Sequence, residues 1–183
     1  MLVNLRALLV RLIDIVLLRG GPEQLPASSG LLAVVVALYV GVSALTYSSI
    51  SNAPNEWPTM MLVETIVLFF GLRAAITIAN KRERFLQTAT AFFAISALFM
   101  PALLPMSATL LPYAVKPDPA MPPPAGLTLL ATTIGIWLIT VQVRSLRAAF
   151  EWHWVASLLF YFALNFAAAV VYVALFAVPP NAS

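Results

Sequence analysis

The sequence predicts an all-α protein, a polytopic membrane helix bundle with five transmembrane helices preceded by an N-terminal amphipathic interfacial helix. Hydrophobic residues make up 62% of the chain and charged residues only 9%, whereas about a quarter of the residues in a soluble domain are charged. The apolar residues form long runs along the whole chain, and charged residues and prolines gather between these runs. We therefore expect one membrane domain without a soluble partner domain.

The composition also excludes several kinds of site. The net charge is +3, but the basic residues lie near one set of segment ends and form no patch suited to nucleic acid. The chain has no cysteine, and its single histidine, His153, cannot form a metal site alone. No phosphate-binding glycine loop, paired-histidine metal motif or serine elbow is present. We expect no catalytic residue, no cofactor and no nucleic-acid partner.

Residues 1–19 predict an amphipathic helix. At about 100° per residue, a polar side and an apolar side separate. The polar side carries Asn4, Ala7, Arg11 and Asp14, and the apolar side carries Leu5, Leu9, Leu12 and Val16. A signal peptide is the alternative, but Arg11 and Asp14 would interrupt its apolar region. We expect this helix to lie on the membrane surface.

A linker at residues 20–30, rich in glycine and proline, leads into five apolar segments. Each segment has the length that crosses a hydrocarbon core of about 30 Å. The expected spans are 31–47, 59–80, 85–111, 127–143 and 154–178, followed by a tail at 179–183. The third span contains Pro101 and Pro105, which predict a kink because proline removes a helical hydrogen bond.

The basic residues predict the orientation of the chain. Eight of them fall at one set of helix ends, namely Arg6, Arg11, Arg19, Lys81, Arg82, Arg84, Arg144 and Arg147, and only Lys116 lies at the other. Cytoplasmic loops carry an excess of lysine and arginine. We expect an integral membrane protein of a bacterial inner membrane, with the N-terminus in the cytoplasm and the C-terminus in the periplasm.

Two ionisable residues, Glu64 and Arg73, lie within the second span and are candidates for an intramembrane contact or proton site. Nine residues separate them, which places them on opposite sides of one helix, so they cannot pair with each other. Arg73 is close enough to the basic loop for its long side chain to reach it. Glu64 is either a protonatable site or a group that bonds a Tyr, Thr or Asn on a neighbouring span.

The other candidates are polar or small residues at helical spacing. In the fifth span Tyr161 and Asn165 share a face, and Asn165 near mid-membrane predicts a hydrogen-bonding partner on another helix. In the second span Gly71, Ala75 and Ala79 recur every four residues. Such a stripe lets another helix approach closely, either within the chain or from a different protein.

The last third of the chain resembles the Yip1 family of small five-span membrane proteins. The similar features are the segment Ile136–Val143 followed by Arg144–Ala148, then a short polar segment and a final hydrophobic helix. The amphipathic leader and the external C-terminus are also similar. The resemblance implies an integral membrane adaptor without known catalytic residues.

The sequence therefore predicts a noncatalytic scaffold, assembly factor or accessory subunit of a larger membrane complex. Its expected partners are the lipid bilayer and either another membrane protein or a second copy of the chain. The alternative is a small transporter or channel component that uses Glu64, with Asn165 and Tyr161 along a polar path. A scaffold would direct Glu64, Arg73 or the Gly71 stripe toward partners on the lipid side. A transporter would arrange these residues around a wet cavity, and an enzyme acting on lipid is a distant third reading because few acid–base groups are present.

Overall fold

The computed structural model describes residues 5–50, 56–115 and 122–176, and this part of the chain is built from helices. Six are α-helices: α1 (Leu5–Val16), α2 (Ser29–Ser48), α3 (Trp57–Ile78), α4 (Phe85–Val115), α5 (Ala125–Phe150) and α6 (Trp154–Phe176). Two short 3-10 helices, η1 (Pro22–Gln24) and η2 (Arg82–Arg84), connect α1 to α2 and α3 to α4. The five helices α2 to α6 are each long and apolar enough to cross a membrane. The prediction of five apolar helices is confirmed.

The helix limits differ from the expected spans mainly in α5. We expected this span to end at 143, but α5 continues to Phe150 and only residues 151–153 separate it from α6. The extension remains helical because its two faces suit different surroundings. Arg144 and Arg147 are exposed, while Ser145, Leu146 and Ala149 are buried against the bundle. The expected tail at 179–183 and the last two residues of the expected fifth span lie outside the described residues.

The start of α2 follows from its sequence. Ser28 is the N-cap, and its hydroxyl accepts a hydrogen bond from the backbone N–H of Leu31 at 3.3 Å. This bond satisfies one of the amide groups that the first turn of a helix leaves without a partner. Of the two serines suited to this role, Ser29 instead forms the first residue of the helix.

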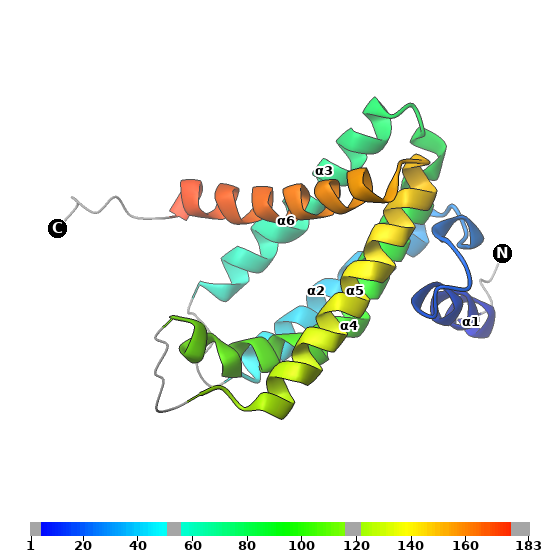
Figure 1. Cartoon of the computed structure of the whole chain (residues 1–183). Helices are drawn as coiled ribbons and strands as arrows, with labels where there is room; N and C mark the ends of the chain where they lie inside the picture. Colours follow the sequence, from blue (N-terminus) through cyan, green and yellow to red (C-terminus); the bar gives the residue numbers. More distant parts are fainter. Residues whose placement is uncertain (1–4, 51–55, 116–121, 177–183) are drawn as a thin grey trace.

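The five long helices form two groups that share one core. α2 packs mainly along α4, α4 packs along α5, and α3 packs mainly along α6 (Figure 1). The core contains residues of all five helices, with Leu72 and Ile76 of α3, Phe93 of α4 and Leu146 of α5 fully buried. We call the end where α3 ends, α4 begins and α5 ends the basic end, because it carries Lys81, Arg82, Arg84, Arg144 and Arg147.

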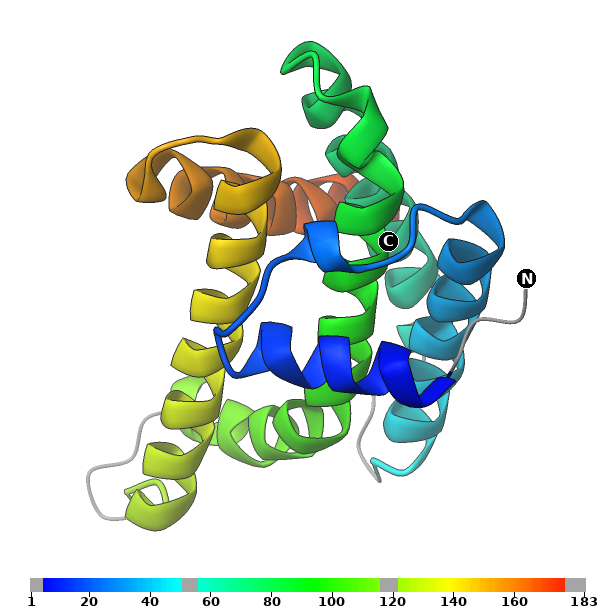
Figure 2. The same ribbon diagram turned by 90° about the vertical axis from the view of Figure 1, so that its right-hand side faces the viewer.

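α4 carries three prolines and still runs as one helix from Phe85 to Val115. Figure 2 shows its later part turned away from its first part, as the kink predicted at Pro101 and Pro105 requires. Thr109 donates to the carbonyl of Pro105 at 2.8 Å. A bond from a threonine to the carbonyl four residues earlier often accompanies a bend in a helix.

α1 forms within residues 1–19, but its buried residues are not those of the expected apolar side, of which Leu12 and Val16 are half-buried against the bundle. Leu8 and Ile15 are buried, with exposed fractions of 9% and 1%, whereas Leu9 of the expected apolar face is 51% exposed. The expected face assumed that α1 meets lipid alone. In the structure, α4 and α5 cover one side of this helix. Asn4 of the expected polar face lies outside the described residues.

Candidate functional site

The Glu64 carboxylate meets the Tyr39 hydroxyl between α3 and α2. The hydroxyl donates a hydrogen bond to Oε1 of Glu64 at 3.2 Å. Tyr39 is only 1% exposed, and its ring packs against Phe93 of α4 with a centroid distance of 5.3 Å. Of the two roles that the sequence left open, the structure therefore supplies the bond to a tyrosine on a neighbouring span. A role in proton transfer stays a prediction.

Further hydroxyl groups surround this pair. Ser43 and Tyr47 follow Tyr39 at intervals of four residues, so all three share one face of α2. Ser43 is fully buried, and its hydroxyl has no hydrogen-bond partner among the described residues. Tyr47 of α2 and Tyr161 of α6 both interact electrostatically with Glu64. Glu64 and Tyr161, two of the predicted candidates, thus belong to one polar cluster formed by α2, α3 and α6.

Arg73 takes no part in this cluster. Its side chain is exposed, and its guanidinium lies over the Phe85 ring at 5.8 Å from the ring centroid. Phe85 is the first residue of α4, directly after the basic loop. The guanidinium therefore rests on an aromatic ring from the start of α4, and its reach to the basic loop stays a prediction.

The prediction for Asn165 is wrong. We expected a partner on another helix, but its amide donates to the backbone carbonyl of Tyr161 at 2.8 Å, one turn earlier in α6. A carbonyl one turn away needs no neighbouring helix to approach, so it satisfies the amide at low cost. Tyr161 and Asn165 are joined through the backbone of Tyr161, and Asn165 does not link α6 to another helix through this bond.

The small-residue stripe is used within the chain. A methyl group added at Gly71 would lie 2.5 Å from Cδ1 of Leu164, so the side chain of α6 already occupies this position. Ala75 and Ala79 pack against the same core. Gly71, Ala75 and Ala79 therefore form part of the internal surface where α3 meets α6, as small residues do between transmembrane helices.

Gln142, which the sequence did not mark as a candidate, joins α5 to α4. Its amide nitrogen donates to the carbonyl of Phe92 at 3.1 Å and to the Ser96 hydroxyl at 3.0 Å. The side chain is 1% exposed, and its amide oxygen has no hydrogen-bond partner among the described residues. A glutamine within an apolar run was the available signal, because such a group needs a partner on a neighbouring helix.

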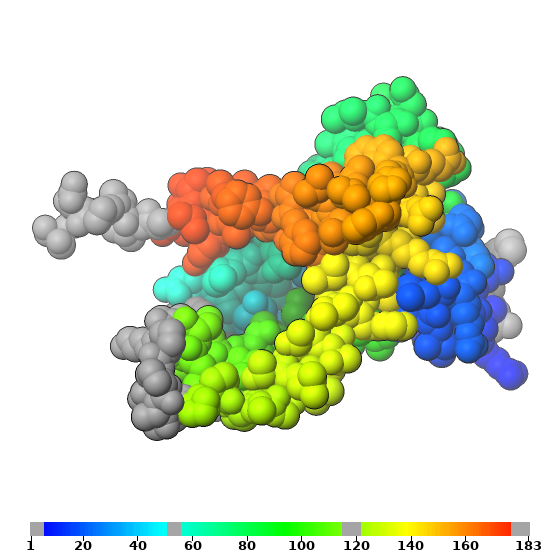
Figure 3. Space-filling model, in the orientation of Figure 1, coloured from blue at the N-terminus to red at the C-terminus, as the bar shows by residue number. Residues whose placement is uncertain are grey.

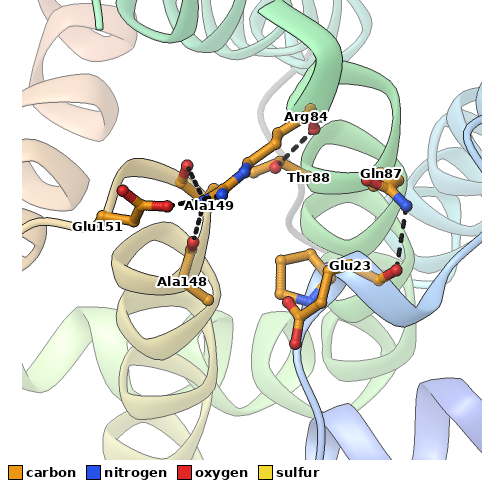
Figure 4. A pocket seen from close by; sticks show the side chains of 8 residues that line it. Glu23, Arg84, Gln87, Thr88, Ala148, Ala149 and Glu151 are labelled. Carbon is orange, nitrogen blue, oxygen red and sulfur yellow. Dashed lines mark hydrogen bonds and ion pairs between the residues drawn. The ribbon is translucent and has the colours of Figure 1, made fainter. Parts of the chain in front are cut away.

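At the basic end, Glu151 is held by two cations. Lys81 and Arg84 approach its carboxylate oxygens at 2.7 Å and 2.6 Å. Arg84 also donates to the backbone carbonyls of Ala148 and Ala149, which end α5 (Figure 4). The hydrogen bond from Lys81, followed by the bond and positive charge of Arg84, holds the pKa of Glu151 below its ordinary value of 4.5.

A pocket of about 290 Å³ lies beside this cluster, between the turn of η1 and the ends of α4 and α5. Gln87 spans one wall and donates to the carbonyls of Glu23 and Leu25 at 3.0 Å and 2.8 Å. Figure 4 shows Arg84 directed across the pocket toward Glu151 and the end of α5. Because its guanidinium already serves these partners, the arginine acts here as a structural link.

Metal and histidine chemistry find little support in the part of the chain that the structure describes. It contains no group of three His, Asp or Glu side chains that could hold a metal ion. His153 is exposed, and its Nδ1 accepts a hydrogen bond from the backbone N–H of Val155 at 3.4 Å. The histidine therefore helps to begin α6.

No protein-family model, curated protein or solved structure matches the chain.

The bond between Tyr39 and Glu64 can be measured with a double-mutant cycle. We expect Tyr39→Phe and Glu64→Met to show a coupling free energy of roughly 0.6 kcal/mol, and at most about 1.7 kcal/mol, as found for hydrogen bonds within membranes. Reversible unfolding in mixed detergent micelles gives the four free energies. Tyr161→Phe is the matched control and should couple more weakly to Glu64→Met. Equal coupling at both tyrosines would contradict the specific bond.

The cluster around Glu151 predicts an acid-sensitive contribution to stability. Because the pKa of Glu151 is lowered in the folded chain, its ion pairs contribute fully above pH 4.5 and lose their contribution as the pH falls through the lowered pKa. We expect Glu151→Gln to lower the melting temperature at pH 7 and to have a smaller effect at pH 3. Glu83→Gln, which changes an exposed carboxylate in η2, is the control. If Glu151→Gln lowered the melting temperature by the same amount at pH 7 and at pH 3, this assignment would be contradicted.

Proposed function

We propose that this chain is a noncatalytic integral membrane protein that scaffolds, assembles or stabilises a larger membrane protein complex through contacts between transmembrane helices. The observation that carries this proposal is the weak coverage of the first part of α5. Every buried residue of α5 lies between Val141 and Phe150, and none lies between Ala125 and Thr140. One side of this first part is half-buried against the bundle, and Trp137 bonds α1, but its other side is left to the surroundings.

The uncovered part of α5 carries residues that transmembrane helices use to pack together. Thr132, Thr133 and Thr140 are exposed, and a methyl group added at Gly135 would meet no atom within 4 Å. Small residues and threonine favour close helix approach in lipid. These residues would let a partner helix approach this surface closely.

The shape of the molecule agrees with this assignment. After the turn at 151–153, α6 leaves α5 at an angle, and the surface is hollowed between α6 and the first part of α5 (Figures 1 and 3). Neither the Gly71 stripe nor the Tyr39–Glu64 pair provides a comparable free surface, because both serve contacts within the chain. α5 is therefore the side on which we place the partner.

This proposal predicts different results for two glycines at which an added side chain would meet open space. Gly135→Leu should abolish stoichiometric co-purification of the partner in mild detergent, because the larger side chain keeps the partner helix away from α5. Gly41→Leu in α2 is the matched control, since its added side chain also meets open space. We expect both variants to elute and melt as the parent does. Retention of the partner by Gly135→Leu would contradict α5 as the docking helix.

The second candidate is a small transporter or channel component, and the Tyr39–Glu64 cluster is the observation that favours it. A carboxyl group among hydroxyls at membrane depth is the kind of group that proton-coupled proteins use. If this candidate is correct, reconstituted vesicles should show proton-dependent flux that Glu64→Gln abolishes. Arg73→Gln is the control and should leave the flux nearly unchanged, since Arg73 faces away from the cluster. Absence of flux in vesicles of the parent would exclude this candidate.

We also propose the orientation and location that the charge pattern favours, with the basic end in the cytoplasm of a bacterium and the C-terminus in the periplasm. The clustering of Lys81, Arg84 and Arg147 at one end of the bundle supports this orientation. An adaptor role without catalytic residues, as implied by the resemblance to the Yip1 family, is compatible with the proposed scaffold.

A further inference from the structure

α1 has three sides with different surroundings. Counting about 100° per residue, one side carries the residues that pack on the bundle and a second carries exposed apolar residues, while a third, narrower side is polar. Leu8, Leu12 and Ile15 form the first side, Leu9, Val10, Ile13 and Leu17 continue the second, and Arg11 and Asp14 mark the third. Arg6 falls on the second side at the start of α1, where its long side chain can extend to water. A helix in water would not expose four large apolar residues on one side without a covering.

α1 crosses the bundle part-way along α4 and α5. Ile15 belongs to the same buried cluster as Ala91 and Ile95 of α4 and Val141 of α5. The indole N–H of Trp137 donates to the carbonyl of Val16 at 3.1 Å, which fixes the end of α1 against α5. Figure 2 shows α1 lying across these two helices, well away from their ends.

The polar side of α1 is turned toward the basic end. Arg11 donates to the carbonyl of Gln24 at 2.5 Å. The same turn is tied to the first part of α4 through Gln87, which bonds the carbonyls of Glu23 and Leu25. The exposed apolar side is therefore turned the other way, toward the apolar middle of the bundle.

The distances from the level of α1 to the far ends of α2 and α5 agree with a bilayer edge at α1. Leu31, near the start of α2, packs against the cluster that holds Ile15. From Leu31 to the end of α2 at Ser48 is about 26 Å, and from Val141 back to the start of α5 at Ala125 is about 24 Å. An interfacial helix lies about 5–10 Å below the surface, so both lengths fit a hydrocarbon core of about 30 Å.

We propose that α1 lies in the surface layer of a phospholipid bilayer with Leu9, Ile13 and Leu17 in lipid, and that the bilayer edge crosses α5 near Val141. The last two turns of α5, the first turns of α4 and both 3-10 helices then stand in water. This inference is independent of the proposed scaffold function.

Two further features agree with this edge. Arg144 and Arg147, both exposed, follow Val141 within two turns and are placed to meet lipid phosphates. The guanidinium of Arg73 lies over the ring of Phe85, which begins α4 about 9 Å beyond Ala91 toward the basic end. The same ring packs against Phe69 of α3 with a centroid distance of 5.4 Å, so this contact keeps Arg73 near the edge, where its long side chain can extend to water.

Spin labels test the proposal directly, because the chain contains no cysteine. Single cysteines replace Ile13, Leu17, Arg147 and Phe166, all of them exposed. Each labelled variant is reconstituted in phosphatidylcholine–phosphatidylglycerol vesicles, and its relaxation by oxygen and by a water-soluble nickel complex is measured. Ile13→Cys and Leu17→Cys should be reached by oxygen and shielded from nickel, at a shallower depth than Phe166→Cys of α6. Arg147→Cys should be reached by nickel.

Three results would overturn the proposal. Free access of nickel to Ile13→Cys and Leu17→Cys would place α1 in water. Shielding of both labels from oxygen and nickel would show that a protein surface covers them instead of lipid. Shielding of Arg147→Cys from nickel would show that the end of α5 does not stand in water. Elution volume and helix content confirm that each variant is folded, so every measured pattern decides the question.

Discussion

Water is scarce in the middle of a bilayer, and the polar side chains of a membrane helix must find their partners within the protein. The arrangement of this bundle depends on that constraint. Glu64 of α3 accepts a hydrogen bond from Tyr39 of α2, and Gln142 of α5 donates to the backbone of α4. Each bond joins two long helices that are consecutive in the chain. They limit how α2, α3, α4 and α5 can slide past one another, because a shift would leave a buried polar group without its partner.

The same constraint explains which polar residues do not join helices. Thr133 and Thr140 of α5 each donate to a carbonyl one turn earlier, and Asn165 of α6 does the same. A side chain that is satisfied by its own helix can face lipid or a neighbour at little cost. The polar residues of α5 are therefore compatible with an exposed surface, whereas the Tyr39–Glu64 pair has to remain inside. This difference is why the structure favours α5 as the contact surface for another membrane protein, and Glu64 as the centre of any intramembrane chemistry.

The sequence was sufficient for the five apolar helices, because runs of apolar residues reflect the thickness of the bilayer. It also placed Glu64 and Arg73 on opposite sides of α3, since helical geometry alone decides their phase. The wrong predictions concern contacts that the pattern does not contain. The partner of Asn165 and the buried side of α1 depend on which surface lies nearby, and the burial of Leu8 in place of Leu9 follows from the position of α4 and α5. The sequence did not predict the extension of α5 to Phe150, because basic residues can mark the edge of a membrane without ending a helix.

That distinction between the end of a helix and the edge of the membrane changes the meaning of the charged residues. Arg73 lies within a hydrophobic segment, and its guanidinium lies over the ring of Phe85, the first residue of α4. Arg84, Lys81 and Glu151 form a set of ion pairs that is exposed, and such pairs are weak in water and sensitive to acid. They are suited to fixing the turn between α5 and α6, because the backbone carbonyls at the end of α5 share the same arginine. Glu64 has no comparable route to water. Its chemistry is thus set by Tyr39 and by the hydroxyl groups of α2 and α6 around it, and a partner helix on α5 would act on that cluster only through α6 or α4.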